Sequence, residues 1–76
     1  MDLARILGHN VRALREAQKL TQEDLAGSTG LKRSYISDME RGQRNPSLRA
    51  LERLAEGLGV PAEVLLRSPV EPTAHG

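Results

Sequence analysis

Apolar residues recur every three or four positions through most of this 76-residue sequence, and glycine or proline interrupts the pattern repeatedly. In the first segment the apolar positions are Leu3, Ile6, Leu7, Val11, Leu14 and Ala17. This spacing places their side chains on one face of an amphipathic helix over residues 3–19. No segment alternates apolar and polar residues as a half-buried strand would. The sequence therefore predicts an all-α fold built from short helices.

Two helices are expected after the first. Thr21 is a candidate N-cap with Asp24 three residues later, and Gly30 is placed to end this second helix in a left-handed conformation. A third helix is expected over residues 33–41, and Gly42 stops it.

Two more helices complete the predicted fold of five. Asn45 and Ser47 are both candidate caps for the fourth helix, and the sequence leaves the choice open. Pro61 opens the fifth helix in the first turn, where proline is tolerated. The apolar positions to bury are Leu48, Leu51, Leu54, Ala55 and Leu58 in the fourth helix, which Gly57 and Gly59 end, and Val64, Leu65 and Leu66 in the fifth.

The length and composition of the chain limit its organisation. A chain of this size buries only about 60–65% of its unfolded surface, which suffices for one core. We expect a single domain over residues 1–67 and a flexible tail over residues 68–76. The sequence contains no cysteine, no metal-ligand spacing and no phosphate-binding glycine motif. It also contains no apolar run of membrane length and no signal-peptide pattern. We therefore expect a cytoplasmic protein without metal, cofactor, membrane contact or evident small-molecule ligand.

No group of residues predicts catalysis. His9 lies on the polar face of the first helix and His75 in the tail, so neither is placed beside a serine and an acid. Glu52 and Glu56 alternate with arginines at helical spacing, which is typical of an exposed charged surface. We therefore do not expect an enzyme.

The net charge of +1 conceals an uneven distribution. Residues 1–20 and residues 32–44 each hold four cations and two carboxylates, whereas the charges of residues 48–67 balance. The excess of positive charge therefore lies in the first two thirds of the chain, where it could form one basic face of the kind that binds nucleic acid. Ordinary solvated surface is the alternative.

The segment over residues 20–42 has the pattern of a helix-turn-helix, with two short helices joined at Gly30. On the second of them Ile36 and Met39 point inward. The opposite face carries Arg33, Ser34, Ser37, Asp38 and Arg41. Arginine, serine and aspartate can bond to base edges in a DNA major groove. An exposed helix face without such a role is usually rich in glutamate and lysine instead.

The order of motifs along the chain resembles that of a known family. The motifs are Arg12-Ala-Leu-Arg15, Leu20-Thr-Gln-Glu-Asp-Leu-Ala26, Gly30-Leu31, Ser34-Tyr-Ile-Ser37, Met39-Glu-Arg-Gly42, Asn45-Pro-Ser-Leu48 and Leu58-Gly-Val60. Over residues 5–67 they are similar to the Cro/lambda-repressor-like helix-turn-helix family, often called Xre. Within that family the chain most resembles the controller proteins of restriction-modification systems. The resemblance implies a five-helix lambda-repressor-like DNA-binding domain.

The resemblance also implies roles for individual residues. It makes Arg33, Ser34, Ser37 and Asp38 the candidates for base reading, with orientation of Arg41 as an alternative role for Asp38. It makes Gln22, Tyr35, Arg41, Arg44 and Asn45 contacts to the DNA backbone. The free amides at a helix N-terminus favour the same role for Gln22. For Tyr35, packing in the core with its hydroxyl at the surface is the alternative.

Three further positions are notable in this comparison. Arg15 and Glu40 occupy places that in the family commonly hold an ion pair, which would tie the first helix to the third. Lys32 departs from the family, which often has serine or threonine before the third helix. A lysine offers no acceptor to the free amides there. Either Lys32 contacts a DNA phosphate, or the helix starts one residue later.

These features predict a transcriptional regulator that binds an operator in double-stranded DNA as a homodimer. The resemblance suggests an autoregulatory controller of a restriction-modification operon. The alternative is an antitoxin-type repressor that also binds a toxin partner. A third interpretation, a protein-interaction module that has lost DNA binding, is opposed by the presence of Gln22, Arg33, Arg41 and Arg44.

The dimer interface is expected at the fifth helix. One recognition helix reads only about four or five base pairs, so a specific operator requires two copies of the protein. Three consecutive apolar positions spread over about 200° of a helix, more than one core-facing stripe. We therefore expect an interface of Val60, Val64, Leu65 and Leu66, with Leu66 outward beside Val60 or the fourth helix. A last helix covered on two sides within the monomer is the alternative.

Overall fold

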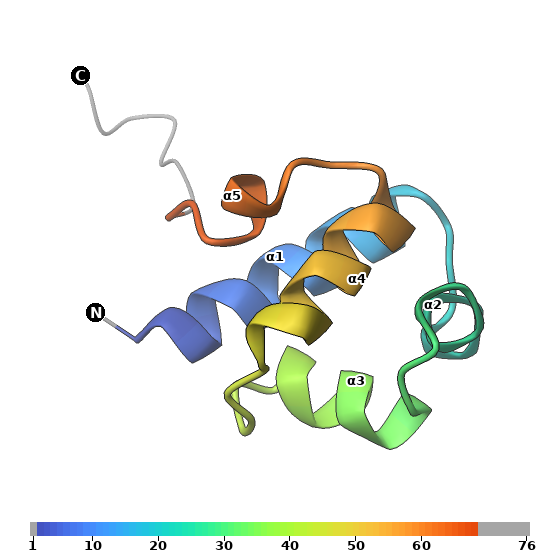
Figure 1. The fold of residues 1–76 in the computed structure, drawn as a ribbon, viewed down its shortest axis with the longest axis horizontal. Helices are drawn as coiled ribbons and strands as arrows, with labels where there is room; N and C mark the ends of the chain where they lie inside the picture. Colours follow the sequence, from blue (N-terminus) through green and yellow to red (C-terminus); the bar gives the residue numbers. More distant parts are fainter. Residues whose placement is uncertain (1, 69–76) are drawn as a thin grey trace.

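Five α-helices and their connecting loops make up residues 2–68, the part of the chain that this computed structural model describes (Figure 1). The helices are α1 Leu3–Ala17, α2 Gln22–Thr29, α3 Arg33–Glu40, α4 Leu48–Leu58 and α5 Ala62–Leu65. No strand occurs among these residues, so the predicted all-α fold is confirmed. The expected tail lies outside the described residues except for Ser68.

Side-chain caps fix the starts of α1, α2 and α4. Asp2 caps α1, and Ser47 rather than Asn45 caps α4. Thr21 and Asp24 form the predicted capping box, in which each side chain accepts a hydrogen bond from the other residue's backbone N–H at 2.9 Å. The pKa of Asp24 is lower than usual, because Thr21 stabilises the charged carboxylate. The backbone N–H of Thr21 makes the larger contribution and its hydroxyl the smaller one. The start of α2 is therefore fixed by contacts within one turn.

One aliphatic core holds the five helices together. Its buried members are Leu7, Val11, Leu25, Ile36, Met39, Leu54, Ala55, Leu58 and Leu65. α1 packs against α3, α4 and α5, and α2 packs against α3 and α4. In Figure 1 α3 lies along one edge of the molecule, with α1 and α4 on its inner side. Its outer face is therefore exposed.

Two leucines that the helical spacing assigns to the core lie on the surface instead. Leu3 is 51% exposed and Leu48 is 80% exposed. Each is the first residue of its helix, and these helix ends extend beyond the core. A spacing of three or four residues identifies the apolar face of a helix but not the point at which its neighbours end.

Two glycines allow close approach between helices. Gly57 was expected to end α4, but the helix continues to Leu58 and ends at Gly59, whose φ is 72°. A Cβ atom on Gly57 would lie 2.8 Å from Cγ2 of Thr29, so Gly57 serves the packing of α4 against α2. A Cβ atom on Gly8 of α1 would overlap with the carbonyl oxygen at Met39. The Gly8 contact brings α1 directly onto the backbone of α3.

Candidate nucleic-acid interface

The turn between α2 and α3 is fixed by local hydrogen bonds. Gly30 has the predicted left-handed conformation, with φ of 76°. The buried hydroxyl of Thr29 donates to the carbonyl of Leu25 at 2.7 Å and accepts from the backbone N–H of Leu31 at 3.2 Å. These bonds determine where α3 begins relative to α2. The two helices and their turn form a helix-turn-helix.

The outer face of α3 carries the residues that were predicted to read bases. Arg33 and Ser34 are exposed, and Ser37 and Asp38 are half-buried. The inward positions Ile36 and Met39 are fully buried. The structure therefore brings the four candidates to one polar surface.

Asp38 binds two arginines on this surface. Arg41 donates to Asp38 at 2.7 Å and to the hydroxyl of Ser37 at 2.9 Å. A second arginine, Arg44, lies 3.8 Å from the other oxygen of the same carboxylate. Of the two roles considered for Asp38, this geometry favours the orientation of Arg41.

Tyr35 lies beside the same cluster. Its ring is half-buried, and Cζ of Arg44 is 4.6 Å from the ring centroid. This is a cation–π arrangement, which restrains the arginine without removing it from solvent. The α3–α4 loop is thereby joined to the body of α3.

Arg33 is paired with a residue that sequence analysis did not identify. Its Nε lies 2.9 Å from a carboxylate oxygen of Glu23 on α2, and both side chains are more than half exposed. Exposed pairs of this kind contribute about 1 kcal/mol or less. A guanine base can therefore compete with Glu23 for this arginine.

Lys32 is the uncapped residue before α3. Its backbone is extended, with φ of −72° and ψ of 146°, and its side chain makes no capping hydrogen bond. The helix begins at Arg33 as predicted, so the alternative of a later start is wrong. Lys32 is exposed, and its side chain does not satisfy the free amides at the start of α3.

The expected pair between Arg15 and Glu40 is present and nearly buried. Nε of Arg15 donates to the Glu40 carboxylate at 2.7 Å and Nη2 at 3.0 Å, with side-chain exposures of 11% and 4%. The hydrogen bond to Glu40 is the main cause that raises the pKa of Arg15 above its usual value. Gln22 also donates to Glu40, at 3.1 Å. Residues of α1, α2 and α3 therefore meet at the Glu40 carboxylate. One of the two side-chain N–H groups of Gln22 is bound to this carboxylate.

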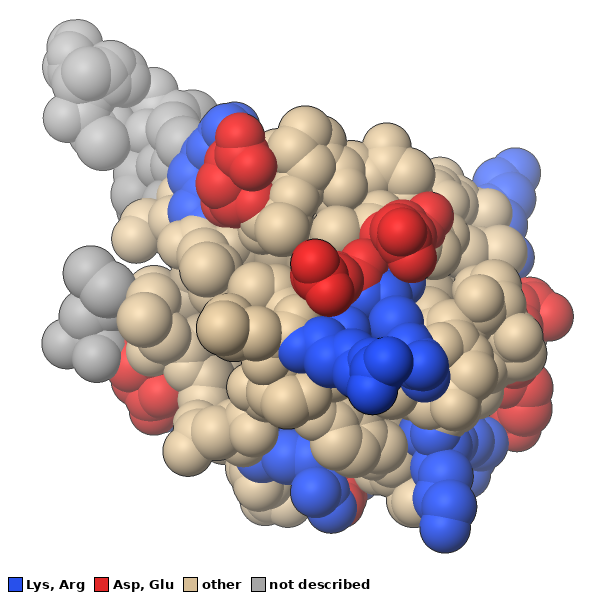
Figure 2. All heavy atoms as spheres, in the orientation of Figure 1, with Lys and Arg blue, Asp and Glu red and all other residues tan. Residues whose placement is uncertain are grey.

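Charged side chains on the visible face follow the predicted asymmetry. Figure 2 shows basic groups along the edge where α3 lies in Figure 1, and acidic and basic groups side by side over α4. The positive excess of residues 32–44 therefore lies at the edge formed by α3 and the loop that follows it.

The structure divides the residues that were expected to form the dimer interface. Leu65 is fully buried in the monomer core, so its proposed contact with a second subunit is wrong. Val64 is half-buried. Val60 lines a hollow with Glu52 and Glu56. Leu66 lines a different hollow, and the two have no residue in common. The structure thus separates residues that were expected to act together.

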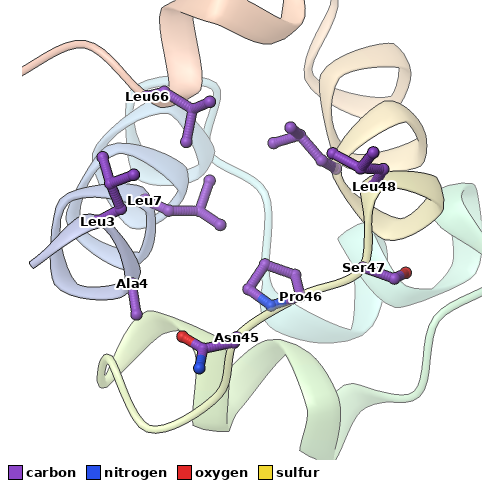
Figure 3. Close-up of a pocket in the computed structure, with 9 residues that line it drawn as sticks. Leu3, Ala4, Leu7, Asn45, Pro46, Ser47, Leu48 and Leu66 are labelled. Carbon is purple, nitrogen blue, oxygen red and sulfur yellow. The ribbon is translucent and has the colours of Figure 1, made fainter.

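Leu66 faces outward beside the fourth helix, which was one of its two expected positions, and lines an apolar groove between the starts of α1 and α4 (Figure 3). The groove has a volume of about 200 Å³ and is lined by Leu3, Ala4, Leu7, Asn45, Pro46, Ser47, Leu48, Leu51 and Leu66. Leu3, Leu48 and Leu66 are the exposed large hydrophobic residues of the described chain. None of the lining residues is charged. Sequence analysis missed Leu3 and Leu48 because their spacing matched that of core residues.

Within residues 2–68 no group of three or more His, Asp or Glu side chains could hold a metal ion. None of the five helices there is long and apolar enough to cross a membrane.

Known proteins share both the sequence pattern and the fold. Residues 11–65 match the family described as helix-turn-helix. An uncharacterized HTH-type transcriptional regulator of Sinorhizobium fredii, y4dJ, is 40% identical over 100% of this chain and 97% of its own length. The restriction-modification controller protein C.AhdI from Aeromonas hydrophila has a TM-score of 0.79 and 44% identity, covering 82% of this chain and 94% of that chain. The controller protein C.Esp1396I, as a tetramer in complex with its natural 35-base-pair operator, gives a TM-score of 0.78 and 35% identity over 86% of each chain.

Proposed function

Because this chain belongs to the helix-turn-helix family, we propose that it is a transcriptional regulator that binds an operator as a homodimer and controls a restriction-modification operon including its own gene. The observation that carries the proposal is the outer face of α3, where arginine, serine and aspartate side chains form one polar surface. The proposed location of the protein is the cytoplasm, where operator DNA is accessible. The proposal requires no reaction, cofactor or metal.

The proposed base contacts come from the first two turns of α3. Arg33 can bond to O6 and N7 of guanine, and Ser34 and Ser37 can donate to or accept from a base edge. Asp38 keeps Arg41 and Arg44 in place, and it contacts a cytosine only where the base displaces one of them. The proposed backbone contacts are Gln22, Lys32, Tyr35, Arg41, Arg44 and Asn45, which flank the base-reading positions.

Arg33 and Arg44 are expected to differ in what they contribute to DNA binding. The operator is first identified by selection from random DNA. Arg33→Ala should then weaken binding to the operator by about 1–3 kcal/mol and binding to random DNA much less, since it removes one base contact per half-site. Arg44→Ala should weaken both alike, because a phosphate contact carries no sequence information. Fluorescence anisotropy titrations on both DNAs measure the difference.

Salt dependence supplies the control for these titrations. With about three cations per subunit at phosphates, the wild-type dimer should show a slope of about −5 in log affinity against log salt. Arg44→Ala should reduce the slope by about 2, whereas Arg53→Ala on the charge-balanced helix α4 should leave it unchanged. A wild-type slope near zero would contradict DNA binding as the function. If Arg33→Ala weakens binding to the operator and to random DNA equally, Arg33 contacts a phosphate and not a base.

The groove lined by Leu3, Leu48 and Leu66 is the proposed dimer surface, which retains Leu66 from the surface first expected and adds the starts of α1 and α4. Exposed apolar side chains of this size on one concave uncharged surface favour contact with another protein surface. Two copies can meet there without opposing like charges, since no lining residue is charged. A two-fold contact would place two recognition helices on half-sites about 34 Å apart. The solved relative that is a tetramer on its operator supports self-association.

Leu48→Asp is expected to convert the dimer to a monomer. The substitution places a carboxylate in the groove, at a side chain that is 80% exposed in the single subunit, so the monomer should remain folded. Sedimentation velocity measures the mass, and circular dichroism measures the helix content. Ala13→Asp, at an exposed position of α1 outside the groove, is the matched control and should remain dimeric. If Leu48→Asp remains a dimer, the interface lies elsewhere.

The antitoxin alternative is not favoured by the comparisons. The two solved relatives described above are restriction-modification controllers, and one of them binds its operator as an oligomer. The proposed contact with a second copy of the chain gives the groove an occupant without a toxin partner. The restriction-modification role is therefore the one we propose.

A further inference from the structure

Asn10, in the middle of α1, holds the end of α5. Its side-chain amide donates to the carbonyl of Leu65 at 2.9 Å and to the carbonyl of Arg67 at 2.8 Å. Both partners are acceptors, so both bonds are made by the amide nitrogen with its two N–H groups. The two bonds lie on either side of Leu66.

The end of α5 depends on contacts from outside the helix. α5 contains only four residues, and a helix of about one turn is not stable alone. Beyond it, the backbone N–H groups of Leu66 and Arg67 bond only three residues back, at 3.2 and 3.3 Å. Burial of Leu65 fixes one side chain of this segment. The direction of the next side chain depends on the carbonyls that Asn10 binds.

That next residue is Leu66, which lies in the groove proposed as the dimer surface. It is 38% exposed, and in Figure 3 its side chain points toward those of Leu3 and Leu7. Asn10 does not line the groove. It therefore acts on the groove only through the backbone around Leu66.

We propose that Asn10 is a positioning residue for dimerisation, which presents Leu66 to the second subunit by binding the carbonyls on both sides of it. The inference rests on the groove being the dimer surface. Gln18, at the end of α1, provides a comparison, because its amide also holds the end of a later helix: it donates to the carbonyl of Leu58 at 2.8 Å. That bond holds the end of α4 and does not involve Leu66.

The test compares two substitutions of the same chemistry in the full chain. Asn10→Asp and Gln18→Glu each replace a donor amide with a carboxylate that faces carbonyl oxygens. Asn10→Asp is expected to raise the dimer dissociation constant about tenfold or more, and Gln18→Glu less than about threefold. Sedimentation over a dilution series measures both constants, with circular dichroism as the check on folding. Equal shifts would assign Asn10 to general stability and overturn the inference.

A second measurement reports on Leu66 without the dimer. In the Leu48→Asp background, Asn10→Ala should lower the ¹⁵N heteronuclear NOE of the Leu66 and Arg67 amides, whereas Gln18→Ala should not. An unchanged Leu66 amide would overturn the role of Asn10 even where the groove is the interface. A Leu48→Asp protein that still dimerises would contradict the dimer surface, and with it this role of Asn10.

Discussion

Glu40→Ala is expected to lower the free energy of unfolding by about 3–5 kcal/mol, the range for removing one partner of a buried ion pair. The Glu40 carboxylate accepts hydrogen bonds from Arg15 and Gln22 and is 4% exposed. Its removal leaves the Arg15 guanidinium, 11% exposed, with the carbonyl of Leu20 and the more distant, half-exposed carboxylate of Glu16 at 3.9 Å. Urea denaturation followed by circular dichroism measures the loss. DNA binding should also weaken, because α3 is no longer tied to α1.

Arg12→Ala is the matched control for Glu40→Ala. Arg12 pairs with Glu16 on the same helix, but the two side chains are 62% and 54% exposed. Removing that pair should change stability by about 1 kcal/mol or less. A double-mutant cycle between Arg15→Ala and Glu40→Ala should show strong coupling. Additive effects would mean that the two residues do not stabilise the fold as a pair.

Gly8→Ala is the second change with a large expected effect. The added methyl group would overlap with the carbonyl oxygen at Met39 and lie 3.0 Å from that at Glu40. Both atoms belong to the backbone and cannot rotate away, so α1 must move from α3. Overpacking of this kind lowers stability by about 1–3 kcal/mol or more. Thermal unfolding measures it, and a shift of α3 should also reduce operator affinity.

Gly27→Ala makes the same chemical change where there is space. Gly27 lies within α2 and a Cβ atom there meets nothing within 4 Å. Alanine should raise stability by about 0.5–1 kcal/mol, since it favours a helix more than glycine does. The two substitutions should therefore act with opposite signs. A Gly8→Ala protein as stable as the wild type would show that α1 does not depend on this contact.

Features with a local signal could be predicted from the sequence. The Thr21 capping box and the left-handed Gly30 depend on residues within one or two turns, and both occur as predicted. The polar face of α3 follows from helical geometry once its inward residues are identified. The pairing of Arg15 with Glu40 came from the family resemblance, since no spacing rule joins residues of separate helices.

Features that depend on distant partners could not be predicted. Gly8 is required by backbone atoms of α3, and Asn10 by carbonyls at the end of α5. Nothing near either residue in the sequence indicates these contacts. The exposure of Leu48 likewise depends on where neighbouring helices end. In the candidate site, the pair of Arg33 with Glu23 was missed because an exposed arginine can reach several carboxylates and the sequence does not select among them.

Tyr35 is the only aromatic residue in the sequence, and its ring lies under the guanidinium of Arg44. Without tryptophan or phenylalanine, near-ultraviolet absorption and intrinsic fluorescence come from this one ring. The wild-type protein therefore carries its own optical label, located beside the proposed backbone contact. Movement of Arg44 toward a phosphate changes the surroundings of that single chromophore. The aliphatic core, by contrast, gives no emission, so unfolding of the core must be followed through the backbone.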